Sequence, residues 1–279
     1  MNDQTAPPAD DRVEPEENAE PATDAAPGYT RFDCTDATDR AGIAAAATAA
    51  RRAIESGDCI VLPTDTVYGI GADAYDADAV QRLLDAKGRG RDMPPPVLIA
   101  DAGSLKALTA KVPEQVDDLV AEYWPGPLTI ICEAAENLRM DLGETRGTVA
   151  LRVPDHPLTR ELLRKTGPMA VSSANRTGQQ AALSCDQAVE QLGDRVAVYL
   201  DGGDVSGTEG KPSTMIDFTI KETGQIIRRG ALDLEALQKH LPELEDLTAT
   251  EDEPVAADPS YTIEELRARH TLQPPLPAG

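Results

Sequence analysis

Three cations lie within five residues of one another in the stretch KGRGR, at Lys87, Arg89 and Arg91. The chain is strongly acidic, with a formal net charge of −23, so its composition gives no reason for such a cluster. Cations on a rigid turn can hold a polyanion such as a nucleoside triphosphate, because ammonium and guanidinium groups bind phosphate oxygens strongly. Basic side chains also suit a solvated helix end, where they complement the helix dipole. The cluster alone leaves both interpretations open.

Polar side chains follow several of the apolar runs that we expect to be strands. They are Thr64, Asp65, Thr66, Ser172, Ser173, Asn175, Arg228 and Arg229. In α/β sheets ligands bind beyond the carboxyl ends of the strands, so the fold could bring these groups to one edge. Each group also has a structural alternative, because hydroxyls satisfy turns and cap helices. Arg228 and Arg229 are adjacent in a strand, so at most one of them should point into a pocket.

Familiar nucleotide-binding and catalytic motifs are missing. GTEGKPS (207–213) resembles a Walker loop, but its spacing is too short and a proline follows its lysine. There is no G-x-S-x-G sequence, and three histidines in the whole chain disfavour a histidine-based triad. The four cysteines are widely spaced, without a CxxC pair, which argues against a zinc site and a disulfide framework. We therefore expect no metal site built from side chains, and a cytoplasmic location.

The middle of the chain alternates helical and strand patterns, which is typical of an α/β domain. Strands are predicted over 59–63, 96–100, 128–132, 148–153, 168–173, 196–201, 213–218 and 225–229. Helices are predicted over 39–56, 76–86, 113–123, 158–165 and 185–192. We expect a single domain with a twisted, largely parallel open sheet that is flanked by helices.

Negative charge gathers at the two ends of the 279-residue chain. Residues 1–30 hold eight acidic side chains and one basic one, and residues 231–279 hold eleven and three. Both segments are poor in large apolar residues, a composition typical of disorder. We predict acidic disordered tails at 1–30 and 233–279 around a catalytic domain at 31–232. No apolar run approaches a membrane span and no secretory signal pattern is present, so we expect no membrane association.

Seven short motifs, taken in order, resemble those of the YrdC-like family of threonylcarbamoyl-AMP synthases. They are PTDTVYGIG (63–71), KGRGRDMP (87–94), WPGPLT (124–129), VALRVPDHP (149–157), SSANRTG (172–178), KPSTMID (211–217) and IIRRG (226–230). Each motif is weak alone, whereas seven in the family's order form a strong signal. The resemblance covers about residues 40–231 and fits the short, single-domain form of the family, with one YrdC-like domain.

The resemblance implies an ATP-dependent reaction. L-Threonine and bicarbonate combine, the carbamate attacks the α-phosphate of ATP, and L-threonylcarbamoyl-AMP and pyrophosphate are released. A threonylcarbamoyl-transferase complex then acts on adenosine next to the anticodon of tRNA. Mg²⁺ is expected on the phosphates, held largely by phosphate oxygens and water.

The resemblance also implies roles for individual residues. Lys87 and Arg89 match the family's K-x-R pair, which would stabilise negative charge at the reacting phosphate. The positions that match nucleotide contacts are Arg89, Thr148, Asn175 and Arg228. The positions that match threonine contacts are Thr66, Arg152, Ser173 and Ser213. No covalent nucleophile is required, so catalysis would consist of positioning and electrostatic stabilisation.

Three residues depart from the commonest family pattern. Gly90 replaces a proline, Met93 replaces an asparagine that faces the nucleotide, and Leu98 replaces a histidine near threonine. The last two changes keep open a paralogue that makes a different carbamoyl-adenylate. An RNA-binding module is a second alternative, which the acidic charge and the 3% aromatic content disfavour.

Overall fold

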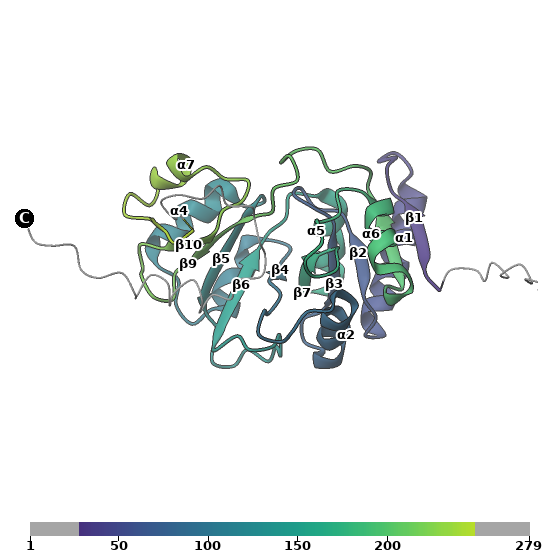
Figure 1. Ribbon diagram of the computed structural model, residues 1–279, viewed down its shortest axis with the longest axis horizontal. Coiled ribbons are helices and arrows are strands. Elements are labelled where there is room, and N and C mark those ends of the chain that lie inside the picture. Colours follow the sequence, from purple (N-terminus) through teal and green to yellow (C-terminus); the bar gives the residue numbers. More distant parts are fainter. Residues whose placement is uncertain (1–27, 249–279) are drawn as a thin grey trace, which may run out of the picture.

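The computed structural model describes residues 28–248. Within this range a single sheet of eleven strands has the order β1-β8-β2-β3-β7-β4-β6-β5-β9-β10-β11, and helices flank it (Figure 1). The strands are β1 (Thr30–Asp33), β2 (Ile60–Leu62), β3 (Gly69–Asp73), β4 (Val97–Leu98), β5 (Leu128–Glu133), β6 (Thr148–Arg152), β7 (Met169–Ser173), β8 (Val198–Asp201), β9 (Thr214–Asp217), β10 (Gln225–Arg228) and β11 (Glu245–Asp246). The main helices are α1 (Arg40–Glu55), α2 (Ala77–Lys87), α3 (Leu105–Leu108), α4 (Glu114–Tyr123), α5 (Pro157–Thr166), α6 (Cys185–Leu192) and α7 (Leu234–Gln238). The predicted α/β class with an open sheet and flanking helices is confirmed.

The strand directions are mixed. Of the ten pairings between neighbouring strands, five are parallel and five are antiparallel, so parallel pairing makes up only half of a sheet that we expected to be largely parallel. One reason is β3, which we did not predict. It follows β2 after the short loop 63–68, and a loop this short joins antiparallel strands, because a parallel connection needs a long crossover.

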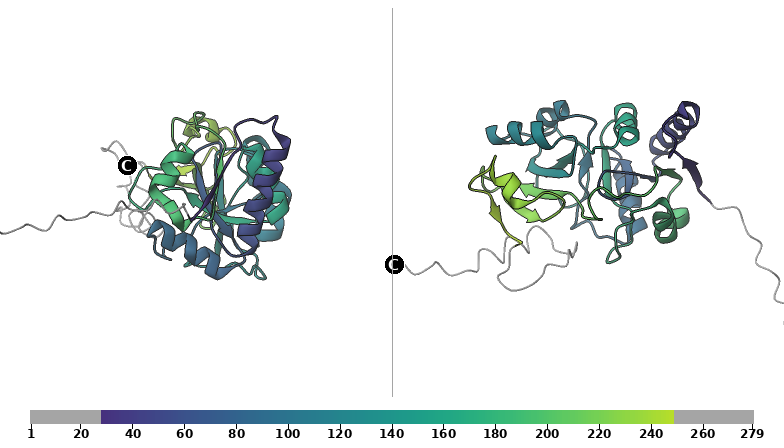
Figure 2. Two further views of the ribbon diagram at one scale, coloured as in Figure 1. Left: turned by 90° about the vertical axis from the view of Figure 1, so that its right-hand side faces the viewer. Right: turned by 90° about the horizontal axis from the view of Figure 1, so that it is seen from above.

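Helices cover both faces of the right-hand half of the sheet. Ile60 and Leu62 of β2 pack in one apolar cluster with side chains of α1 and α5. The intervening Val61 packs in another cluster with side chains of α2 and α6, because successive strand residues face opposite sides. Figure 2 shows α1 and α5 on one side of the strands and α2 and α6 on the other.

The two ends of α2 are defined by its capping residues, and its C-terminal end places Lys87 and Arg89. Asp76 caps the start of this helix by accepting hydrogen bonds from the backbone N–H groups of Asp78 and Ala79. Gly88 ends it with φ +65°, a left-handed conformation that favours glycine. Lys87 is therefore the last helical residue, and Arg89 begins the following loop.

The structure corrects the predicted ends of two elements. The expected strand 96–100 is reduced to the two residues of β4. The predicted domain boundary at 232 is too early, because residues 233–248 include α7 (Leu234–Gln238) and β11 (Glu245–Asp246). Leu237, Leu241 and Leu244 of this segment are buried in the core. The recurrence of leucine in this segment was an apolar signal that the acidic composition concealed, although only Leu237 lies in α7.

The predicted acidic tails fall largely on residues that the structure does not describe. Residues 1–27 and 249–279, which make up most of the tails predicted at 1–30 and 233–279, lie outside the described residues. Between 28 and 248, no helix has the length and apolar character needed to cross a membrane.

Candidate active site

Lys87 lies at the end of α2 with its side chain almost fully buried. Its Nζ donates to the backbone carbonyl oxygens of Ser173 and Asn175, the latter at 2.6 Å. The Asn175 side chain is itself fixed, because its Nδ2 donates to the carbonyl oxygens of Arg176 (2.9 Å) and Gln179 (2.7 Å). The predicted residues Lys87, Ser173 and Asn175 thus meet in one place, where α2 contacts the loop after β7.

Arg89 lies beside this contact. Its Nη1 donates to Ser172 Oγ at 3.0 Å. Its Nε is buried and has no hydrogen-bond acceptor among the residues that the structure describes. A buried guanidinium N–H without an acceptor is costly, so this group is poised to donate to a bound ligand.

Arg152, the last residue of β6, holds the turn between β2 and β3. Its Nε donates to Gly126 O (3.0 Å), its Nη1 to Thr66 Oγ1 (2.9 Å) and its Nη2 to Asp65 Oδ1 (2.6 Å). Thr64 stabilises the same turn by accepting from the backbone N–H groups of Thr66 (3.1 Å) and Val67 (3.2 Å). The predicted residues Thr66 and Arg152 are therefore in direct contact.

Ser213 and Arg228 form a third contact between predicted residues. Arg228 donates from Nη2 to Ser213 Oγ (2.8 Å) and from Nε to Ser213 O (3.0 Å). Ser213 Oγ also lies 2.7 Å from Thr129 Oγ1 of β5. Gly230 permits this close approach, because a Cβ there would lie 2.3 Å from Pro212 O. The motif IIRRG (226–230) thus requires glycine at position 230, two residues after Arg228.

Positive charge concentrates where these contacts lie. Burial, and secondarily Arg89, lowers the pKa of Lys87 to about 7. Burial, followed by the charges of Arg152 and Arg89, lowers the pKa of Arg228 to about 10. Burial also lowers the pKa of Arg89 and that of Arg152, where Asp65 acts in the opposite direction. The positive charges of Arg89 and Arg152 thus disfavour the charged forms of their neighbours Lys87 and Arg228, which a bound polyanion would stabilise.

Arg91, Arg229 and Thr148 do not join this cluster of Lys87, Arg89, Arg152 and Arg228. Arg91 pairs with Asp141, and Arg229 pairs with Asp246 at 2.6 Å. Only one of the two adjacent arginines at the end of β10, Arg228, therefore points inward, in agreement with the prediction that at most one would. Thr148 lies at the opposite end of β6 from Arg152, about 13 Å along the strand. Its hydroxyl donates to Thr145 O at 2.8 Å.

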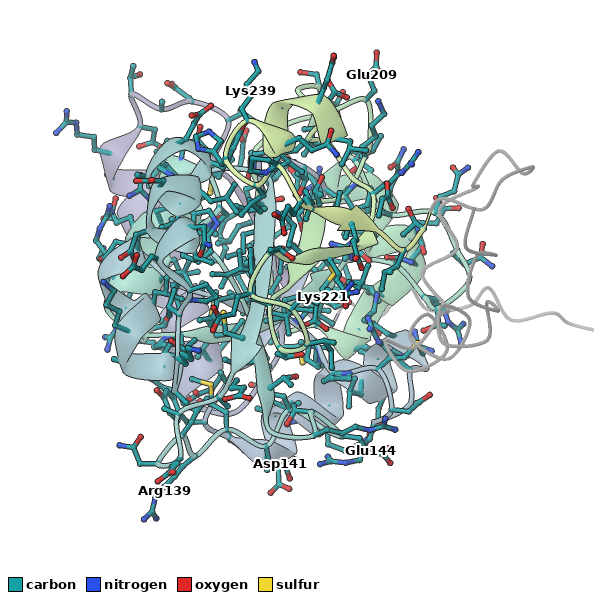
Figure 3. The ribbon with its side chains drawn as sticks, turned by 90° about the vertical axis from the view of Figure 1, so that its left-hand side faces the viewer. Arg139, Asp141, Glu144, Glu209, Lys221 and Lys239 are labelled. Atoms are coloured by element: carbon teal, nitrogen blue, oxygen red, sulfur yellow. The ribbon has the colours of Figure 1, made fainter. Side chains whose placement is uncertain are left out.

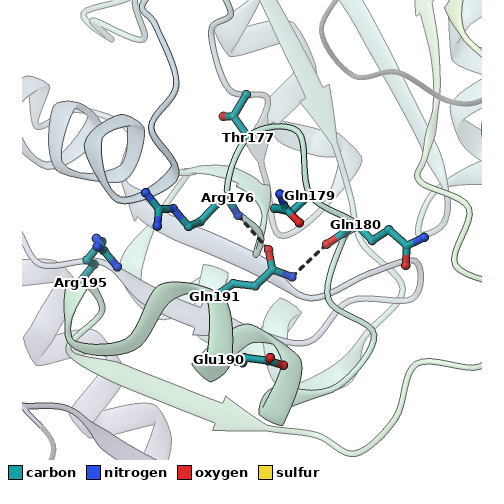
Figure 4. Close-up of a pocket in the computed structure, with 7 residues that line it drawn as sticks. All are labelled: Arg176, Thr177, Gln179, Gln180, Glu190, Gln191 and Arg195. Carbon is teal, nitrogen blue, oxygen red and sulfur yellow. Dashed lines mark hydrogen bonds between the residues drawn. The ribbon is translucent and has the colours of Figure 1, made fainter.

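Two pockets lie next to the elements of the site. One has a volume of about 750 Å³ and is bounded by the loop 176–180 and by α6 (Figure 4). Gln191 joins its walls, accepting from Arg176 N (3.0 Å) and donating to Gln180 O (3.0 Å). Another, of about 270 Å³, is lined by Thr148 and by residues of the segment 134–149. Thr148 therefore lines a pocket to which none of the four clustered cations contributes.

The sequence left two contributors without a role. Asp65 was noticed only as part of a polar turn, and Thr129 only as the last residue of WPGPLT. Their contacts with Arg152 and Ser213 depend on strand neighbours that are far apart in the chain. Between residues 28 and 248, no three His, Cys, Asp or Glu side chains are grouped to hold a metal ion.

Comparisons with known proteins agree on one family. The family model Sua5_yciO_yrdC, described as "Telomere recombination", matches residues 52–230. A Mycobacterium tuberculosis protein, provisionally named a threonylcarbamoyl-AMP synthase, is 46% identical over 211 residues, which are 75% of this chain and 94% of that protein. The threonylcarbamoyl-AMP synthase of Bacillus subtilis is 34% identical over 216 residues, 75% of this chain and 61% of its own length. The crystal structure of Pyrococcus abyssi Sua5 complexed with L-threonine superimposes with a TM-score of 0.71 and 31% identity, covering 82% of this chain and 66% of that one.

Proposed function

Because the chain belongs to the Sua5/YciO/YrdC family, we propose that it makes L-threonylcarbamoyl-AMP from L-threonine, bicarbonate and ATP, and releases pyrophosphate. The observation that carries the proposal is the cluster of Lys87, Arg89, Arg152 and Arg228. Within residues 28–248, only Arg152 of these four forms a salt bridge. Most of the positive charge is thus available to a bound anion, and ATP supplies one.

Lys87, Arg89 and Arg228 would bind the phosphates. The threonine carbamate attacks the α-phosphorus, and the bond to the pyrophosphate oxygen breaks. Negative charge then spreads over the phosphate oxygens, and fixed cations stabilise it without solvent reorganisation. Asn175, whose main chain holds Lys87, would contact the nucleotide, and Thr148 would do so from the 270 Å³ pocket.

Threonine would lie on the side of Arg152 and Thr66. The guanidinium suits the carboxylate of the amino acid, and hydroxyl groups suit its polar side chain. Ser213, which accepts from Arg228, would lie between the nucleotide and the amino acid, and Ser173 would border the amino acid near Lys87. The positions of these contacts support an attack of the carbamate on the phosphate between the two sets.

Mg²⁺ commonly accompanies ATP, but the described side chains offer it no carboxylate group of its own. Any Mg²⁺ would be held by phosphates and water, and would neutralise phosphate charge. We further propose that the product passes to a transferase complex that modifies tRNA, and that the reaction takes place in the cytoplasm. The free state of all four cysteines supports that location.

Pyrophosphate release from ATP and bicarbonate, measured across a panel of amino acids, tests the proposal. We expect release that depends on threonine, with the adenylate detected by mass spectrometry. Release with a different amino acid would replace the proposal with a paralogue of altered specificity, for which Leu98 is a reason, since it is buried among apolar side chains. RNA binding without any turnover would replace it with a binding module.

A further inference from the structure

Among the described residues, Arg152 is the one member of the cationic cluster that forms a salt bridge with a carboxylate. The side chains of Arg152 and Asp65 are 7% and 15% exposed, and Arg152 Nη2 lies 2.6 Å from Asp65 Oδ1. A guanidinium has five N–H groups, and three of those on Arg152 donate to protein oxygens. Two N–H groups remain, which is the number that a bidentate contact with a carboxylate uses.

One of the two carboxylate oxygens of Asp65 accepts hydrogen bonds from the protein. Oδ1 accepts from Arg152 Nη2 and from the backbone N–H of Asp155 at 2.9 Å. Among the described residues no donor is found for Oδ2. An ionised carboxylate can accept about four hydrogen bonds, so Asp65 retains the capacity to bind a cation. The two contacts on Oδ1 fix the direction in which Oδ2 is presented.

We propose that Asp65 binds the α-ammonium of the incoming amino-acid substrate, before bicarbonate adds to that nitrogen, while Arg152 binds its carboxylate. This inference rests on the proposed function, because it concerns the threonine side of the same site. Adjacent positive and negative groups on the protein match the adjacent negative and positive groups of a zwitterionic amino acid. The other three cations form no salt bridge with a described carboxylate, although the charge of Asp92 acts on Arg89, and they therefore match phosphates, which carry negative charge alone.

Asp65 also keeps the two substrates in their places. A phosphate group that bound to Arg152 would lie next to the negative charge of Asp65. Neighbouring like charges repel strongly in a partly buried site. No described carboxylate influences the pKa of Lys87 or that of Arg228, so these two cations impose no such repulsion. The pair thus favours an amino acid over a phosphate at one end of the cluster.

The test compares L-threonine with 3-hydroxybutanoate, which has the carboxylate and the hydroxyl but lacks the ammonium. Dissociation constants are measured by calorimetry for the wild-type protein, for Asp65→Asn and for the control Asp118→Asn, an exposed aspartate of α4. A charge-assisted hydrogen bond should give the wild type and the control about a 10- to 100-fold preference for threonine. In Asp65→Asn the preference should fall to within about threefold.

A purely structural role for Asp65 would weaken both ligands equally and leave the preference intact, which would overturn the inference. Absence of threonine binding in the wild type would instead overturn the proposed function, and the inference with it. If Asp65→Asn does not fold, the wild type alone supplies the test. Its preference for threonine should disappear as the pH rises through the pKa of the threonine ammonium, and a preference independent of pH would overturn the inference.

Discussion

The cations of the site and those of the surface have different partners. Lys87, Arg89 and Arg228 are buried or half-buried, and their hydrogen bonds go to neutral oxygens of the chain. Surface cations pair with carboxylates, as Arg51 does with Glu55 and Lys106 with Asp117. Figure 3 shows other exposed charged groups, among them Arg139, Asp141, Glu144, Glu209 and Lys239, projecting from the outside of the molecule.

This difference in partners indicates that the surface cations contribute to the fold, whereas the buried cations bind a ligand. A surface ion pair contributes little to stability, because water screens it. Buried cations without a counter-ion reduce stability, so their retention needs another reason. Two pairs of near neighbours in sequence illustrate the contrast: Arg89 points inward and Arg91 outward, and Arg228 points inward and Arg229 outward.

The largest effect should come from Arg89→Gln compared with Arg91→Gln. Arg89 has a buried Nε without an acceptor, whereas Arg91 is paired with Asp141. Loss of one fixed donor at a reacting centre typically lowers turnover by about 100-fold or more. We expect that loss of threonine-dependent pyrophosphate release in Arg89→Gln, and a change within about threefold in Arg91→Gln. Equal losses in both variants would show that the loop as a whole matters and not the direction of one side chain.

A smaller effect is expected for Arg228→Gln compared with Arg229→Gln. Arg228 is two residues from Gly230 and donates to Ser213, while Arg229 reaches Asp246 at the surface. Removing one charge-assisted contact with the nucleotide should raise the KM for ATP about 10- to 30-fold. The KM for threonine should change less. Steady-state kinetics with each substrate varied in turn would check this, and an unchanged KM for ATP in Arg228→Gln would place the nucleotide elsewhere.

Much of the fold followed from local sequence signals. The predicted helices over 76–86 and 185–192 correspond to α2 (Ala77–Lys87) and α6 (Cys185–Leu192). β3 escaped prediction because GIGAD has two glycines and little β-branched character. Its consequence, antiparallel pairing with β2 and β7, depends on non-local neighbours that a single sequence does not specify.

The site was predictable as residue types but not as contacts. The motifs pointed to Lys87, Arg152 and Arg228, yet the partners of these residues come from strands that are distant in the chain. Ser213 meets Arg228 because β9 and β10 pair, and Arg152 meets Asp65 because the sheet brings the end of β6 near the turn after β2. The family's K-x-R pattern selected Arg89 and not Arg91, but the ion pair of Arg91 with Asp141 is not visible in the sequence KGRGR.

The buried position of Lys87 should give ATP binding an unusual pH dependence. Burial lowers the pKa of Lys87 to about 7, so the amine is charged below that pH and neutral above it in the unliganded protein. ATP needs the charged form, so its dissociation constant should rise about tenfold per pH unit above 7. Binding at pH 8 should also take up close to one proton.

Calorimetry in two buffers with different ionisation enthalpies measures that proton uptake. Lys87→Arg is the matched control, because a guanidinium keeps its charge throughout this range. The variant should bind ATP without proton uptake and with a flat pH profile from 7 to 9. A flat profile in the wild type would mean that Lys87 is charged in the free protein, and would remove the contrast with surface lysines.

The smallest effect is expected at the surface, for Lys111→Gln. Lys111 pairs with Glu222, and both side chains are more than half exposed, at 68% and 63%. Water already solvates both charges, so removal of one should change the melting temperature by no more than about 2 °C. Threonine-dependent pyrophosphate release should stay within about twofold of the wild type, because the contact lies outside the cationic cluster. Thermal unfolding and the same release assay measure the two quantities. A large loss of activity at unchanged stability would mean that charge outside the site governs ATP binding over a long range. Raising the ionic strength of the wild-type assay would then reproduce the loss, because salt screens exposed charges much more than buried ones.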